Sequence, residues 1–104
     1  MNENHSGTPA MNNLLEKIRP LVQYTRQLAQ EAEKLYALDV EAIIKSHDSN
    51  PDRIEHCLDG ILDFCFDEKM LLLFKKLCRY YYTIDPVATS EYVYFYKEMC
   101  DNSD

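Results

Sequence analysis

The chain has 104 residues, a net charge of −7 and 46% hydrophobic residues, with only two glycines and four prolines. This composition is typical of one globular domain, and the scarcity of turn formers favours a few long helices joined by short loops. The acidic balance argues against nucleic-acid binding, because phosphate backbones select clustered lysine and arginine. No stretch approaches the ~20 apolar residues that span a bilayer, and the polar N-terminus does not resemble a signal peptide. We therefore expect a cytoplasmic protein with no membrane partner.

A long first helix is predicted after a disordered tail at residues 1–11. Asn13 followed by Glu16 is a capping signal, and the pattern after it supports a helix from about 13 to 46. Pro20 removes one backbone donor and crowds the carbonyl of Glu16, so we expect a kink or a restart of the helix at that point. The apolar and small residues that recur at helical spacing are Leu15, Ile18, Val22, Thr25, Ala29, Ala32, Tyr36, Val40 and Ile43.

A second helix is predicted to begin at Pro51, after the loop 47–50. Asn50 is a favoured N-cap, and proline suits the first helical position. Near residues 66–68 the pattern allows two interpretations. Asp67 could cap a third helix after a tight turn, which we prefer, or one apolar stripe could continue through this point in a single longer helix. The apolar face of the second helix comprises Ile54, Leu58, Ile61, Leu62 and Cys65.

The last helix is predicted from about 86 to 100, with Asp85 as its N-cap and Pro86 at its first position. Residues 102–104 form a polar end. Short loops make sequential helices antiparallel neighbours. The sequence therefore predicts an all-α fold, a small antiparallel bundle of three to four helices with a long first helix, in one domain over residues 12–101.

The four cysteines show no C-x-x-C pair and sit within apolar helical patterns. In a reducing compartment such residues behave as small buried hydrophobes. We therefore interpret Cys57, Cys65, Cys78 and Cys100 as free thiols of the core. A reactive or metal-binding thiol, or a disulfide, is the alternative.

No pattern for catalysis or for a cofactor is present. Two glycines cannot build a glycine-rich phosphate loop, and no serine has the surroundings of a nucleophile. Asp52, His56 and Asp59 share one helix face, which is a weak metal pattern compared with a capping or solvated role. We expect no enzyme activity, no cofactor and no metal site.

An acidic stripe is predicted on the second helix, where carboxylates recur every four residues. It is either a solvated face or a surface for a basic partner, such as the Lys75–Arg79 face of a second copy. Its members are Glu55, Asp59, Asp63 and Asp67.

Aromatic residues gather in the last third of the chain. Residues 80–82 span about 200° of a helix, and residues 92–96 encircle one, so a small core cannot bury them all. Tyrosine is enriched at protein interfaces, where it combines a large contact area with a polar tip. The predicted interaction surface comprises Tyr80, Tyr81, Tyr82, Tyr92, Tyr94, Phe95, Tyr96 and Met99.

These patterns favour a helical protein-interaction module or homodimer, whose partner is a protein, either itself or another. A regulatory protein that binds a small ligand between its last two helices is the first alternative. A metal-dependent helical enzyme using His56 is the second. A structural explanation competes with all three: the tyrosines serve only to pack the domain, with their hydroxyl groups exposed to water at the edge of the core.

Overall fold

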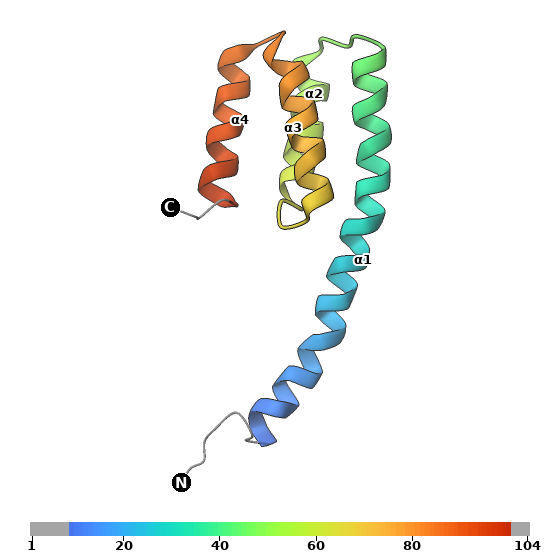
Figure 1. Cartoon of the computed structure of the whole chain (residues 1–104), viewed down its shortest axis with the longest axis vertical. Coiled ribbons are helices and arrows are strands. Elements are labelled where there is room, and N and C mark those ends of the chain that lie inside the picture. The colour runs from blue at the N-terminus through green and yellow to red at the C-terminus, as the bar shows by residue number, and fades with distance from the viewer. Residues whose placement is uncertain (1–8, 101–104) are drawn as a thin grey trace.

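The computed structural model describes residues 9–100, which form four helices: α1 (Pro9–Lys45), α2 (Pro51–Leu62), α3 (Glu68–Tyr82) and α4 (Pro86–Met99). Consecutive helices run in opposite directions, and the upper part of α1 lies beside the α2–α3 pair (Figure 1). No strand occurs in this part of the chain. The predicted all-α bundle with a long first helix is confirmed.

Side-chain caps set the starts of the three short helices. Asn50 and Asp85 each accept a hydrogen bond from a backbone N–H of the first turn, immediately before Pro51 and Pro86. Asp67 caps α3 in the same way, with its carboxylate 3.0 Å from a backbone nitrogen. These bonds satisfy donors that a helix start leaves unpaired. The break at Asp67 is therefore real, and the single longer helix does not form.

Helix α1 is much longer than the helices beside it. It begins at Pro9, ahead of the predicted Asn13, and continues through Pro20. Its 37 residues span about 55 Å, whereas the 15 residues of α3 span about 22 Å. Every residue from 10 to 28 is exposed, and Ala29 is the first buried one. We call residues 10–28 the arm.

The arm curves as it leaves the bundle (Figure 1). Helical spacing places Pro20 on the side of α1 opposite Ile18 and Val22, about 160–200° away. Its missing N–H therefore lies on the outer side, and bending is the usual response of a helix to an internal proline. The predicted restart does not occur.

The core lies between the upper part of α1 and the other helices. It contains residues that helical periodicity selects, with Ile43, Ile54 and Leu77 fully buried. Tyr81 is also fully buried, and it is the largest of the fully buried side chains. In the part of the chain that the structure describes, no helix is long and apolar enough to cross a membrane.

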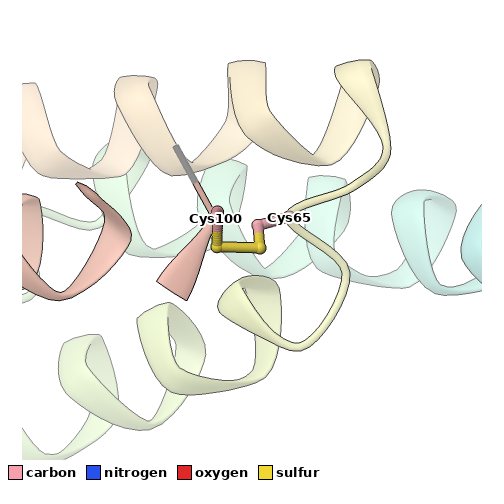
Figure 2. Close-up of a disulfide and its surroundings, with 2 residues drawn as sticks. All are labelled: Cys65 and Cys100. Atoms are coloured by element: carbon pink, nitrogen blue, oxygen red, sulfur yellow. A yellow bond between two sulfur atoms is a disulfide. The ribbon is translucent and has the colours of Figure 1, made fainter. Parts of the chain in front are cut away.

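A disulfide joins Cys65 to Cys100, which corrects the prediction of four free thiols (Figure 2). The end of α2 at Leu62 leaves Cys65 in the α2–α3 turn, and α4 brings Cys100 to a Cα–Cα distance of 6.1 Å. Cys57 and Cys78 are buried free thiols, as predicted, and burial raises the pKa of each to about 11.

Replacing both Cys65 and Cys100 by serine is expected to lower the free energy of unfolding by about 2–4 kcal/mol. The bond closes a loop with a sequence separation of 35 and so restricts the unfolded chain. Urea denaturation followed by circular dichroism measures this change. Reductant should destabilise the natural protein by a similar amount and leave the double variant unaffected. Equal stability of the two oxidised proteins would contradict this role.

Candidate interaction surfaces

Two of the predicted surface tyrosines lie inside the domain. Tyr81 is fully buried, and its hydroxyl donates to Oε2 of Glu55 over 2.5 Å. Tyr92 is almost fully buried, and its hydroxyl donates to Oδ1 of Asp59 over 2.8 Å. Burial first, and then the carboxylate partner, raises the pKa of both phenols. Neither residue belongs to an exposed surface.

The acidic stripe is thus partly an internal feature. Glu55 and Asp59 of α2 hold the hydroxyls of Tyr81 and Tyr92, while Asp67 caps α3. Asp63 is exposed. Members of the predicted acidic stripe and of the predicted aromatic surface are therefore hydrogen-bonded to each other, and these bonds join α2 to α3 and α4.

The other aromatic residues divide into half-buried and exposed groups. Tyr80 donates from its hydroxyl to the carbonyl oxygen of Asp48 over 2.6 Å. The Tyr96 ring packs against Phe74, with centroids 5.7 Å apart. The exposed group comprises Tyr82, Tyr94, Phe95 and Met99.

A small groove runs between α3 and α4, with a volume of about 260 Å³. The Phe74–Tyr96 ring pair lies at this groove, and Val93 contributes from α4. Basic residues also line it. The full lining is Leu71, Phe74, Lys75, Cys78, Arg79, Val93, Tyr96 and Lys97.

The largest apolar surface is on the arm. Its large apolar side chains are between 40% and 64% exposed, because no other described helix extends beside them. By helical spacing they occupy about half of the helix circumference. Arg19, Arg26 and Pro20 lie on the other half. The apolar members are Leu14, Leu15, Ile18, Leu21, Val22, Tyr24 and Leu28.

Leucines recur every seven residues along α1, at Leu14, Leu21, Leu28 and Leu35. All four are at least 40% exposed. Such a repeat is the sequence signal of a coiled-coil seam. The apolar stripe predicted from the sequence is the neighbouring one, part of which packs on the bundle, and it does not include these leucines.

A larger groove separates α1 from α2, with a volume of about 460 Å³. Tyr36 crosses toward α2 over Gly60, where a Cβ atom would collide with its ring tip. Leu35, the last member of the leucine repeat, also lines this groove. The lining comprises Ala32, Leu35, Tyr36, Asp39, Ile43, Arg53, His56, Cys57 and Phe64.

The residues considered for a metal site do not converge. Among the described residues, no group of three histidine, cysteine or acidic side chains is arranged to hold a metal ion. Asp59 is engaged by Tyr92, and His56 is exposed beside the α1–α2 groove.

Replacing Tyr81 by phenylalanine is expected to lower the free energy of unfolding by about 1–3 kcal/mol, since Glu55 loses its buried donor. Because the pKa of Tyr81 is higher in the folded than in the unfolded chain, the neutral phenol contributes stability below about pH 10. This contribution is lost as the pH rises through the folded-state pKa. The variant should therefore lose less stability on moving above pH 10. Tyr82→Phe, at an exposed neighbour, is the matched control and should change neither quantity. Equal effects of the two substitutions would contradict the internal bond.

Comparison of the chain with protein-family models, with curated proteins and with solved structures gives no match. Among the described residues, the arm, the α1–α2 groove and the α3–α4 groove are three apolar features that the internal packing leaves open.

Proposed function

We propose that this protein is a helical protein-interaction module and that the arm of α1 is its docking element. One observation carries the proposal, which is the exposure of every residue from 10 to 28 although half of the helix face is apolar. Most helical stability in proteins comes from packing an apolar face, and residues 10–28 bury no such face in this structure.

The apolar face also offers enough free energy for specific binding. Full burial of a leucine or isoleucine side chain contributes about 1.5–3 kcal/mol. Leu14, Ile18, Leu21 and Leu28 are each roughly half exposed, so each has part of this contribution still to gain. An apolar strip at helical spacing is the feature that a helix or a groove of a partner recognises.

The exposed aromatic residues of α4 support the same function with a second contact area. Tyr94 and Phe95 pack together, with ring centroids 6.4 Å apart, and Met99 is exposed one turn later. Large aromatic side chains and methionine are typical of the centres of interfaces. We assign them a supporting role, because the buried tyrosines leave this surface smaller than the sequence suggests.

Site-specific photocrosslinking on the full chain tests the docking role of the arm. A photoreactive amino acid at position 21 is expected to give protein crosslinks in cells, whereas the same group at position 23 should give few. Both positions are exposed on the arm, but Leu21 lies on the apolar face and Gln23 on the opposite side of the helix. Equal yields at both positions, or none at either, would exclude the arm as a specific docking element.

A second candidate function is the binding of a small anionic amphiphile in the α3–α4 groove. The lining favours it, because an apolar wall with Lys75, Arg79 and Lys97 at its edge suits an acyl or aromatic tail with one negative head group.

Titration with dodecanoate tests this candidate, with calorimetry as the measurement. Val93→Asp places a carboxylate in the groove and should weaken binding at least tenfold. Val87→Asp is the matched control, because Val87 is on the same helix, is exposed and does not line the groove. Equal affinity of the two variants would reject the groove as the site.

The disulfide argues against the predicted cytoplasmic location. The sequence-based prediction is the cytoplasm, whereas stable disulfides are typical of oxidising compartments. Cys57 and Cys78 are buried thiols that either environment accepts. We therefore propose an oxidising compartment as the location, because the structure contains the Cys65–Cys100 disulfide.

A further inference from the structure

The apolar face of the arm is continuous with the α1–α2 groove. Helical spacing puts Leu14, Leu21 and Leu28 on the same side of α1 as Ala32 and Leu35, which line that groove. The α2–α3 turn meets α1 on another side, near Arg26 and Gln30. A helix that lay along α1 would therefore contact the arm with one half and enter the groove with the other.

Resting on the docking role proposed for the arm, we propose that the occupant is a second copy of this chain, with the two α1 helices antiparallel. Each arm then covers the groove of the other copy. A two-fold axis near residue 23 relates the pair, so that one surface serves as both partners of a self-complementary interface.

The leucine repeat restricts the pair to registers that differ by seven residues, and the two-fold axis near residue 23 selects one of them. Antiparallel coiled-coil packing sets Leu14 of one copy against Ala32 of the other, Ile18 against Leu28, and Leu21 against Thr25. Two of these layers pair a large side chain with a smaller one, which allows close packing. Pro20 lies on the far side of the helix from the seam, so its missing donor does not interrupt the contact.

The charged residues beside the seam agree with the same register. It places Lys17 of one copy next to Glu31 of the other, and the symmetry repeats this pair. Within the described part of the chain, neither residue forms an ion pair of its own. A parallel pair would instead place Lys17 beside Val22 and leave both charges unmatched.

The overall charge distribution also favours the antiparallel arrangement. The arm carries three basic residues and one acidic residue, a net charge of +2. Residues 29–100 carry eight basic and fourteen acidic residues, a net charge of −6. Antiparallel packing lays a positive arm along a negative bundle, whereas parallel packing brings the two negative bundles together. Opposite potentials across an interface select orientation.

Charge reversal on the full chain tests the register, with the dimer dissociation constant measured by sedimentation. Lys17→Glu and Glu31→Lys should each raise that constant at least roughly fivefold, because the symmetry makes each change act twice. The double variant restores both pairs and should return to within about threefold of the natural protein. Arg19→Glu, the same charge reversal at an exposed position away from the seam and from the α2–α3 turn, is the matched control and should have little effect.

Circular dichroism of each variant verifies that the exposed substitutions leave helicity unchanged. Failure of the double variant to recover affinity, or an effect of Arg19→Glu equal to that of Lys17→Glu, would overturn the antiparallel register. A natural protein that remains monomeric at high micromolar concentration would overturn self-association. If position 21 then crosslinks to a different protein, the docking role of the arm stands while the second copy is excluded as its occupant.

Discussion

The difference in length between α1 and the other helices is the constraint on which the rest of this structure depends. Three helices of 12 to 15 residues cover only the second half of a 37-residue helix. The apolar pattern of α1 nevertheless runs along its whole length, without a change of phase at Ala29, where burial begins. One half of the pattern packs in the core and the other half is exposed to solvent. The same amphipathic periodicity of α1 therefore accounts for both the bundle and the arm.

Inside the bundle, packing depends on polar groups as much as on apolar ones. Tyr81 and Tyr92 supply large apolar rings to a small core, and their hydroxyls reach Glu55 and Asp59 at the edge of α2. A buried hydroxyl without a partner would cost free energy, so these carboxylates allow tyrosine where phenylalanine would otherwise be required. The disulfide then holds the C-terminal end of α4, a helix with few buried residues of its own.

Features encoded by neighbouring residues were predictable from the sequence. The caps at Asn50, Asp67 and Asp85 act within one turn, so the helix starts followed directly from their side chains. Contacts between distant residues were not predictable. Cys65 and Cys100 are brought together only by the α2–α3 turn and the return of α4, and the tyrosine–carboxylate bonds depend on the same packing. The leucine repeat of α1 is present in the sequence, but the adjacent apolar stripe, which packs on the bundle, was predicted in its place.

The division of α1 also explains why exposed apolar residues need not reduce the specificity of association. An irregular apolar patch attracts many partners, whereas a seam of leucines seven residues apart limits a partner helix to registers that differ by one heptad. Lys17 and Glu31 narrow the choice further, since they lie beside the seam and oppose a partner that presents the wrong charge. In the proposed pair, the spacing of the leucines and the charges of Lys17 and Glu31 therefore act on the same strip of α1, and a partner helix would have to match both.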